Sequence, residues 1–108
     1  MKIKTSELAG AALDWAVAKC EHPKTFNSHR TLRSIWSFRY STDWSQGGPI
    51  IERESMELLQ MRNPNYAQAR VLFGVWLPGP TPLIAAMRCY VASKLGDEVE
   101  VPDELIKE

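Results

Sequence analysis

Apolar residues recur at helical spacing near both ends of the chain. Between residues 11 and 20, Leu13, Val17 and Cys20 fall on one helical face, which predicts an amphipathic helix. His22-Pro23 ends this helix, because the residue before a proline is pushed out of helical geometry.

A C-terminal helix is predicted over residues 82–95, with clear boundaries at both ends. Thr81 suits the N-cap, Pro82 suits the first helical position, and Gly96 suits the position after the last residue. The expected core face of this helix is formed by Ile84, Met87, Val91 and Leu95.

The segments between these helices predict a small antiparallel sheet. Residues 21–34 are polar and predict a loop, and residues 35–40 alternate between apolar and polar side chains as a half-buried strand does. Residues 55–60 favour a second strand, although their alternation also suits a helix. Residues 69–77 predict a buried strand that pairs antiparallel with it, after a turn or loop at residues 62–65.

Residues 43–54 predict a third helix with two possible starts. Asp43 and Gln46 have the spacing of a capping box. Pro49 interrupts the pattern, since a proline inside a helix removes a hydrogen bond. Either a first turn from Asp43 to Gln46 is followed by a kink, or the helix begins with Pro49 at its first position. The sequence leaves both versions open.

These elements predict an α/β fold in which a small antiparallel sheet packs with about three helices, as an ABA-type sandwich. The length of 108 residues suits a single domain. We expect that domain to span residues 1–96, followed by an acidic tail over residues 97–108 that runs extended over the surface.

Charge is balanced in total but not along the chain. Thirteen basic residues match thirteen acidic ones, which argues against strong nucleic-acid binding and against a membrane-surface protein. Residues 19–39 nevertheless carry five basic side chains and one acid, and residues 97–108 carry six acids and one base. The two patches could serve partner docking or a homo-oligomer, or could pair with each other.

Apolar stretches and cysteines indicate where the protein acts. The longest apolar stretches are shorter than the roughly 18 residues of a membrane span, and no targeting segment is apparent. Cys20 and Cys89 lie in predicted helices, and we expect both to be reduced thiols. The expected location is the cytoplasm.

Four long segments resemble one family of small phage proteins. The segments are residues 2–8, 12–18, 41–54 and 81–99. They resemble the NinX-like family of phage and prophage proteins from the accessory region of lambdoid phages, and the order of elements is similar to the phage ABA-sandwich domain. Residues 22–38 and 57–78 match neither pattern. The resemblance implies a phage accessory protein in the host cytoplasm, a setting in which host takeover or counter-defence is common.

The most suggestive candidate site is the start of the predicted third helix. Backbone N–H groups at a helix start can hold an anion, and the two glycines there would leave them accessible. The candidate ligand-binding residues are Tyr40, Ser41, Thr42, Asp43, Trp44, Gly47, Gly48, Arg53 and Arg88. A plain helix cap explains the same residues, because hydroxyls and Asp are the usual N-cap residues. The lysine of a phosphate-binding loop is missing, so nucleotide hydrolysis is not expected.

Other chemistry has weaker support in the sequence. Residues 24–39 interleave basic and aromatic side chains that could stack on RNA bases, but a solvated loop beside an aromatic strand explains them equally. Cys20, His22 and His29 could form a cysteine–histidine pair or hold a metal, yet no catalytic or metal-ligand spacing surrounds them. We therefore expect no enzyme activity, no metal and no cofactor.

The expected function is binding. The first hypothesis is a non-enzymatic phage accessory protein that binds a small nucleotide-like anion or a host protein. The alternatives are a protein-interaction inhibitor without a ligand pocket, a small enzyme and an RNA-binding module. Among the four tryptophans, Trp44 is the one expected to wall a pocket or anchor a partner, and the others are expected to pack in the core or at its edge.

Overall fold

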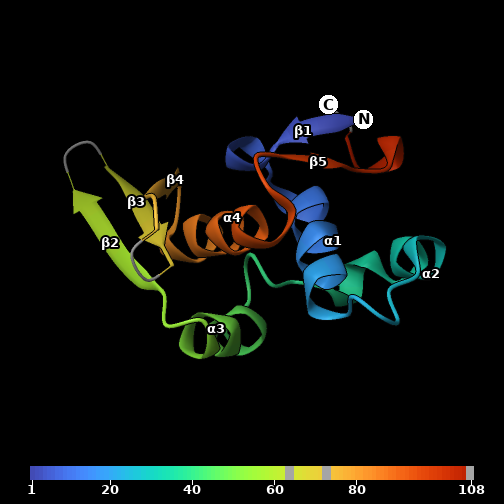
Figure 1. Cartoon of the computed structure of the whole chain (residues 1–108), viewed down its shortest axis with the longest axis horizontal. Coiled ribbons are helices and arrows are strands. Elements are labelled where there is room, and N and C mark those ends of the chain that lie inside the picture. The colour runs from blue at the N-terminus through green and yellow to red at the C-terminus, as the bar shows by residue number, and fades with distance from the viewer. Residues whose placement is uncertain (63–64, 72–73, 107–108) are drawn as a thin grey trace.

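Four α-helices and two small antiparallel sheets form the part of the chain that the computed structural model describes, residues 1–62, 65–71 and 74–106 (Figure 1). The helices are α1 (Gly10–Glu21), α2 (Ser28–Arg33), α3 (Trp44–Arg53) and α4 (Pro82–Leu95). The strands are β1 (Lys2–Lys4), β2 (Glu57–Arg62), β3 (Asn65–Arg70), β4 (Leu77–Gly79) and β5 (Glu98–Glu100). Three single 3₁₀ turns are η1 (Thr5–Glu7), η2 (Ile35–Ser37) and η3 (Asp103–Leu105). The predicted α/β class is confirmed.

Helix α4 is the central element of the fold. The Thr81 hydroxyl accepts a hydrogen bond from the Ile84 N–H at 3.1 Å, and Gly96 ends the helix at φ 89°, a conformation that favours glycine. Both predicted ends are confirmed. The helix packs against the sheet of β2, β3 and β4 on one side and against α1 on the other (Figure 1).

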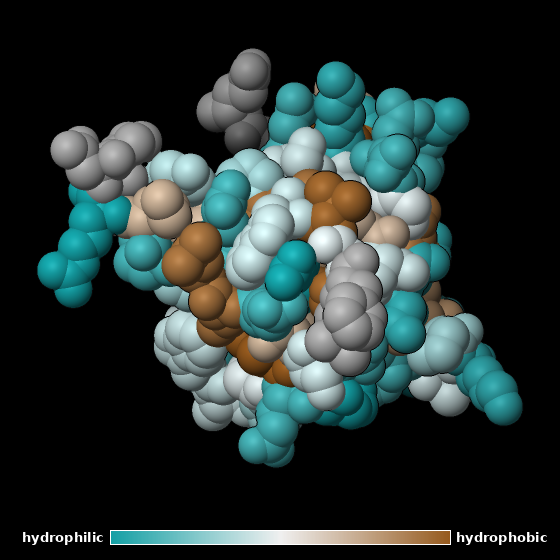
Figure 2. Space-filling model, turned by 60° about the vertical axis from the view of Figure 1, so that its left-hand side comes forward, coloured by the Kyte–Doolittle hydropathy of each residue, from teal (hydrophilic) through white to brown (hydrophobic). Residues whose placement is uncertain are grey.

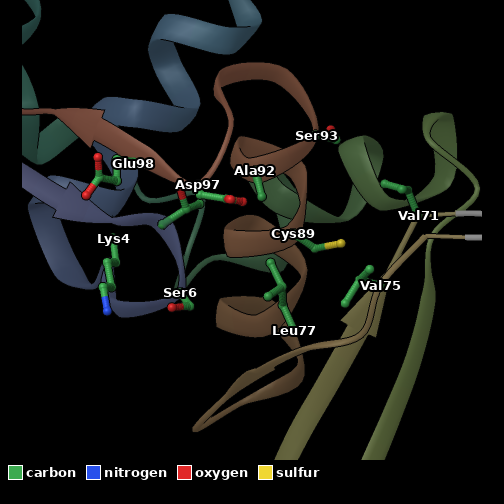
Figure 3. Close-up of a pocket in the computed structure, with 11 residues that line it drawn as sticks. Lys4, Ser6, Val71, Val75, Leu77, Cys89, Ala92, Ser93, Asp97 and Glu98 are labelled. Carbon is green, nitrogen blue, oxygen red and sulfur yellow. The ribbon is translucent and has the colours of Figure 1, made fainter.

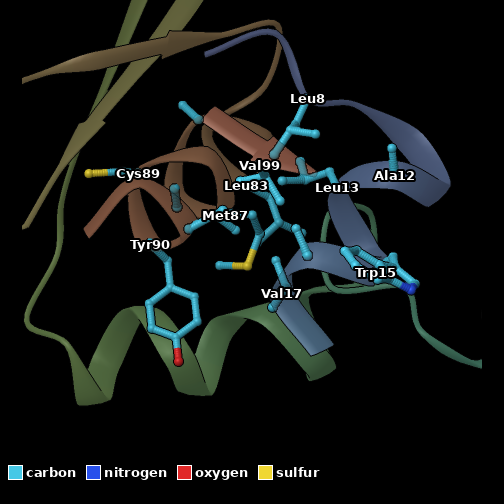
Figure 4. Packing of buried hydrophobic residues seen from close by; sticks show 14 of the residues in the cluster. Leu8, Ala12, Leu13, Trp15, Val17, Leu83, Met87, Cys89, Tyr90 and Val99 are labelled. Carbon is cyan, nitrogen blue, oxygen red and sulfur yellow. The ribbon is translucent and has the colours of Figure 1, made fainter. Parts of the chain in front are cut away.

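The main core lies between α4 and α1. Leu13 and Val17 of α1 point toward Leu83 and Met87 of α4 (Figure 4), and all four are almost completely buried. Burial of each such side chain stabilises the fold by about 1.5–3 kcal/mol. The predicted N-terminal helix is confirmed. The core face of α4 is wider than predicted, since residues around most of its circumference are buried: Leu83, Ala85, Ala86, Met87, Cys89, Tyr90 and Val91.

The two ends of the chain meet in a second, two-stranded sheet. Strand β1 pairs antiparallel with β5, and Thr5 extends the pairing by donating its N–H to the Asp97 carbonyl at 2.7 Å. Val99 and Val101 are buried in the core. The expectation of a surface tail from residue 97 was therefore wrong for these positions, because alternate apolar residues within the acidic segment pack inward.

Two predictions between residues 21 and 40 were wrong. Part of the expected loop is the helix α2, which begins because the Asn27 side chain caps it by accepting the Arg30 N–H at 2.8 Å. The expected strand over residues 35–40 is absent, since its first residues form the turn η2. The alternation of apolar and polar residues indicated the wrong element here. Ile35 is buried, but Trp36, which was expected to pack in the core or at its edge, is 84% exposed.

The three-stranded sheet confirms the predicted antiparallel pairing and corrects its boundaries. Strands β2 and β3 pair in a register that places Glu57 opposite Arg70. The predicted strand over residues 69–77 is wrong in extent, because β3 ends at Arg70 and the short β4 begins only at Leu77. The predicted turn at residues 62–65 includes residues 63–64, which lie outside the described part of the chain.

Candidate functional site

The start of α3 is a closed helix cap. The Asp43 carboxylate accepts the Ser45 N–H at 2.9 Å, and the Asp43 carbonyl accepts the N–H groups of Gln46 and Gly47 at 3.0 and 2.9 Å. Helix α3 runs through Pro49, so the version beginning at Pro49 is wrong. The reciprocal half of the capping box is also absent, since the Gln46 side chain instead accepts the Arg39 N–H at 2.8 Å.

This cap occupies the position that was predicted to bind an anion. The N–H groups of Ser45, Gln46 and Gly47 already have acceptors, and a carboxylate stands where an anion would bind. The same carboxylate pairs with Arg39 at 3.2 Å, and its hydrogen bonds from Ser45 lower the pKa of Asp43. Thr42 and Trp44 are exposed beside the cap.

Gly47 is required for close packing of helices. A Cβ at this position would lie 2.4 Å from the Tyr40 carbonyl oxygen and 2.6 Å from Leu83 Cδ1, so no larger residue fits. A Cβ at Gly48 would meet nothing nearer than Trp44 at 3.9 Å. The first glycine therefore lets α3 approach α4, and only the second faces open space.

Ser41 is fixed by a buried carboxylate. Its N–H donates to Asp14 Oδ1 at 2.8 Å, and both residues are buried between α1 and the segment that leads into α3. Burial raises the pKa of Asp14, and hydrogen bonding from Ser41 opposes this only in part. The Ser41 hydroxyl has no hydrogen-bond partner among the described residues. This pair anchors the chain, and the Ser41 N–H is not available to a ligand.

Arg53 lies at the opposite end of α3 from the cap, in a charged cluster. Its guanidinium donates to both Glu21 oxygens, at 3.2 and 2.6 Å, and to Glu54 at 3.0 Å. The Tyr90 hydroxyl also donates to Glu21 at 2.6 Å. Burial alone would raise the pKa of Glu21, but the hydrogen bonds from Arg53 and Tyr90 outweigh it and lower that pKa. The cluster joins α1, α3 and α4.

Arg88, the last predicted ligand residue, holds the backbone of other elements. Its guanidinium donates to the Leu8 carbonyl at 2.7 Å and to the Pro78 carbonyl at 3.1 Å. The structure thus gathers Tyr40 to Gly48 around one helix start and leaves Arg53 and Arg88 in two separate places with internal partners.

Cys20 and His29 line different pockets. Cys20 lies with Arg53 and Tyr90 beside a pocket of about 470 Å³, whereas His29 lines a groove on α2. Burial, helped by the neighbouring Glu21 carboxylate, raises the pKa of the Cys20 thiol to about 11, so the thiol is protonated at neutral pH. Both cysteines are free.

A cavity of about 840 Å³ separates the two sheets. Val71, Val75 and Leu77 stand on one side of it, and Lys4 and Asp97 stand on the other (Figure 3). The Thr5 hydroxyl at its margin already donates to the Gly96 carbonyl at 2.6 Å. A small-molecule site needs a few polar groups that converge on one point. The charged side chains here, such as Lys4 and Asp97, are of opposite sign and lie on one rim of the cavity, so they do not provide such a set.

An apolar groove of about 490 Å³ runs along α2 and η2. It is lined by Ala11, His29, Leu32, Arg33, Ile35, Trp36, Glu104 and Leu105. The Trp36 side chain is 84% exposed at this groove, whereas Trp15 is buried against Phe26. An exposed indole beside apolar side chains is typical of a surface that another protein covers. The alternation over residues 35–40 predicts a half-buried strand, so it did not indicate that Trp36 is exposed.

Basic side chains lie on α2 and in the turn before it, and one of them, Arg33, lines the groove. Lys24, Arg30 and Arg33 are exposed, and none of them forms an ion pair within the part of the chain that the structure describes. Arg39 is likewise exposed but pairs with Asp43. Glu104 is the acidic residue that lines the groove. Arg33 and Glu104 therefore meet at the same groove, whereas Arg30 lines a separate pocket with His22 and Phe38.

The comparison with protein families identifies the group to which this sequence is related. A family model described as Bacteriophage P22, NinX, matches residues 4–94, which is most of the chain. The chain belongs to this phage family. A search of curated protein sequences finds no significant match. The resemblance stated from the four sequence segments is confirmed.

Two further features concern metals and membranes. No group of three or more potential metal-ligating side chains is found among residues 1–62, 65–71 and 74–106. None of the helices in the same ranges has the length and apolar content needed to cross a membrane.

Proposed function

We propose that this NinX-family protein is a non-enzymatic accessory protein that binds an acidic host protein through the groove along α2 and η2, here called the docking groove. The observation that carries the proposal is the exposed Trp36 ring at its edge. Burying such a ring against a partner removes a large apolar surface from water, and tryptophans are common among the residues that dominate binding energy.

The charge around the docking groove indicates the chemistry of the partner. Arg33 lines the groove, Arg30 lies elsewhere on α2, and neither forms an ion pair in the described part of the chain. Acidic side chains on a partner would meet Arg33 at the rim of the interface, where such pairs mainly raise the association rate and are weakened by salt. We therefore expect affinity to fall as salt concentration rises.

A protein partner suits this geometry better than a small anion. The Ser45 N–H and the Arg53 guanidinium are engaged by internal carboxylates, and the Gln46 and Gly47 N–H groups by the Asp43 carbonyl, so an anion would have to displace these acceptors. The docking groove instead combines Leu32 and Leu105 with a projecting indole. Open apolar grooves of this kind fit a helix or an extended segment of another protein.

The proposed setting follows from membership of the phage family. We infer that the protein acts in the host cytoplasm during infection, where binding a host protein would serve takeover or counter-defence. No catalytic step, metal or cofactor is part of this proposal.

Photo-crosslinking in infected host cells tests the proposed function. A photoreactive amino acid at position 36 should give one dominant crosslinked protein, and the same amino acid at position 44 should not. Trp44 is the matched control because it is also exposed, at 52%, but lies at the start of α3. The crosslinked protein is then purified and titrated with the wild-type chain.

Three outcomes of this experiment oppose the proposal. Equal crosslinking at positions 36 and 44 would indicate contacts without specificity. Crosslinking at position 36 mainly to RNA would favour the RNA-binding alternative. A purified candidate that binds Trp36→Ala as tightly as the wild-type chain would remove the groove from the interaction.

A further inference from the structure

A small pocket, here called the polar pocket, lies beside α2 where the turn after α1 leads into that helix. Its volume is about 200 Å³. Pockets for drug-sized ligands measure about 300–1,000 Å³, so the polar pocket suits one small chemical group. The polar side chains that line it are His22, Thr25, Asn27, Arg30, Thr31 and Ser34.

The composition of the polar pocket indicates the charge of its ligand. All of its polar side chains can donate a hydrogen bond, and Arg30 is a cation. None of the described residues that line it is acidic. By contrast, the cavity between the two sheets, the docking groove and the pocket beside Cys20 each include at least one carboxylate. The polar pocket therefore favours an anion.

The side chains of Arg30 and Thr31 have no internal acceptor, unlike the groups at the start of α3. Arg30 forms no ion pair in the described part of the chain. Thr31 is only 7% exposed, and no hydrogen bond of its hydroxyl is found among the described residues. A donor that is largely removed from water gains from an acceptor on a ligand. The backbone adds nothing here, because Asn27 already accepts the N–H groups of Arg30 and Thr31, at 2.8 and 2.9 Å.

The acidic residue nearest in the sequence, Glu21, is engaged outside the polar pocket. Its carboxylate accepts hydrogen bonds from the Arg53 guanidinium and from the Tyr90 hydroxyl, both at 2.6 Å. It lines the pocket beside Cys20 and not the polar pocket. The positive charge of Arg30 is therefore left for a ligand.

Two aromatic rings form an apolar part of the polar pocket. Phe26 packs edge to face on Trp15 with ring centroids 5.2 Å apart, and Phe38 stacks on Tyr40 with centroids 6.1 Å apart. Both phenylalanines are partly buried, and their internal partners hold the rings in place. An organic group attached to the anion can lie against these rings.

The other end of the molecule is less suited to an anion. Helix α2 and the three-stranded sheet lie at opposite ends (Figure 1). The face on the side of the sheet shows a run of apolar side chains among hydrophilic ones (Figure 2). Moving an anion from water to apolar surroundings costs free energy, so the free donors beside α2 offer a better site.

We propose that the polar pocket binds the phosphate group of a small organic phosphate. The Arg30 guanidinium provides charge and two parallel N–H donors, a geometry that matches phosphate oxygens. The hydroxyls of Thr31 and Ser34 supply further donors. A phosphate offers three strong acceptor oxygens and a carboxylate offers two, so a phosphate can use more of these donors. The organic group lies against Phe26 and Phe38.

The polar pocket and the docking groove use different faces of α2. Leu32 and Arg33 line the groove, whereas Arg30 and Thr31 line the polar pocket. A phosphate in the polar pocket leaves the exposed Trp36 ring uncovered, since Trp36 lines only the groove. The two sites can therefore be tested with different substitutions.

Titration of the purified chain with adenosine monophosphate, followed by NMR of the backbone amides, tests this proposal. This probe carries a phosphate and a ring system that can lie against the phenyl rings. Saturable shifts should concentrate at residues 22–34, and inorganic phosphate should compete more weakly. Adenosine without its phosphate should give no saturable shift.

Substitutions on α2 show which face binds. Arg30→Ala should weaken the binding of adenosine monophosphate by about tenfold or more, and Thr31→Val by about threefold, because each removes donors to the phosphate. Arg33→Ala is the matched control, since Arg33 is also exposed and unpaired in the described part of the chain but lines the docking groove. It should bind within about twofold of wild type. Both arginine variants should keep the wild-type melting temperature.

Four results would overturn the proposal. They are the absence of a saturable shift at millimolar adenosine monophosphate, equal binding of adenosine, equal binding of inorganic phosphate, and equal losses for Arg30→Ala and Arg33→Ala. Equal binding of inorganic phosphate would mean that the organic group is not recognised. Arg30→Ala should keep the crosslinking at position 36, so this proposal and the proposed function fail independently.

Discussion

Residues 40–53 and residues 28–39 carry similar side chains but differ in how those side chains are used. Both segments contain aromatic rings and arginines. In the first, Asp43 caps its own helix and Arg53 is held by Glu21 and Glu54. In the second, Trp36 and the arginines of α2 project into solvent.

This difference teaches that residue type does not by itself identify a binding site. A helix start binds an anion only when its N–H groups are free, and a carboxylate at the N-cap already supplies the acceptor. An exposed indole without an internal partner has contact area left for another molecule. Residues 40–53 therefore have structural partners, whereas the docking groove is the proposed binding surface, and substitutions can test this division.

The largest expected effect on stability is that of Gly47→Ala. The new Cβ would meet the Tyr40 carbonyl oxygen and Leu83, and we expect the free energy of unfolding to fall by about 2–3 kcal/mol. Gly48→Ala is the matched control and should gain up to about 1 kcal/mol from helix propensity. Urea unfolding measures both. Similar values for the two glycines would contradict the close packing of α3 on α4.

The next effect is that of Glu21→Gln, which we expect to lower the free energy of unfolding by about 1–2 kcal/mol at neutral pH. This loss of stability is small for an ion pair because the Arg53 side chain is half-exposed and solvent weakens the pair. The lowered pKa of Glu21 stabilises the folded state above the ordinary carboxyl value of 4.5, and this contribution is lost as pH falls through the lowered pKa.

The pH dependence separates this effect from a simple packing defect. The difference in melting temperature between wild type and Glu21→Gln should be largest near neutral pH and should shrink below about pH 4.5. Glu52→Gln is the control, since Glu52 is exposed on α3, next to Arg53. A difference that stays constant across this range would show that the charge of Glu21 does not matter.

Asp14→Asn should have a smaller effect of opposite sign. The raised pKa of Asp14 means that its charge costs stability once pH rises above that pKa, whereas asparagine keeps an acceptor for the Ser41 N–H. We expect the variant to equal or exceed the wild-type free energy of unfolding at pH 7, by up to about 1 kcal/mol. Asp14→Ala leaves the Ser41 N–H without its acceptor and should be destabilised by about 1–2 kcal/mol. Urea unfolding at pH 7 orders the three proteins, and equal losses for both variants would oppose this reading.

The smallest effect on stability should be that of Trp36→Ala, within about 0.5 kcal/mol of wild type. The side chain is 84% exposed, so little buried surface is lost. Thermal unfolding checks this expectation. A loss of several kcal/mol would place Trp36 in the core and would bring residues 28–39 into the structural group.

The sequence predicted those parts of the fold that depend on local chemistry. The ends of α4 follow from Thr81, Pro82 and Gly96, which act on their own neighbours in the chain. Asn27 carries the same kind of signal for α2, but the polar residues around it favoured a loop. The position of Trp36 depends on how a single 3₁₀ turn orients the ring, which alternation along the chain does not reveal.

The candidate site was harder to predict because several of its contacts join residues that are far apart in the chain. The Asp43 cap is local and was one of the two helix starts that the sequence left open, but the partners of Arg53 and Arg88 come from distant positions such as Glu21 and Leu8. Only the folded chain shows that these two arginines are engaged. The burial of Val99 also depends on pairing with β1 at the other end of the chain.

The central claim is that Trp36 anchors a host protein, and the affinity of that protein tests it most directly. Isothermal titration of the purified crosslinked protein with the wild type, Trp36→Ala and Trp44→Ala should show a loss of about thirtyfold or more for Trp36→Ala. Trp44→Ala should bind within about twofold of wild type, because small surface changes outside an interface have little effect. Equal affinities for all three proteins, or a larger loss at Trp44, would contradict the account.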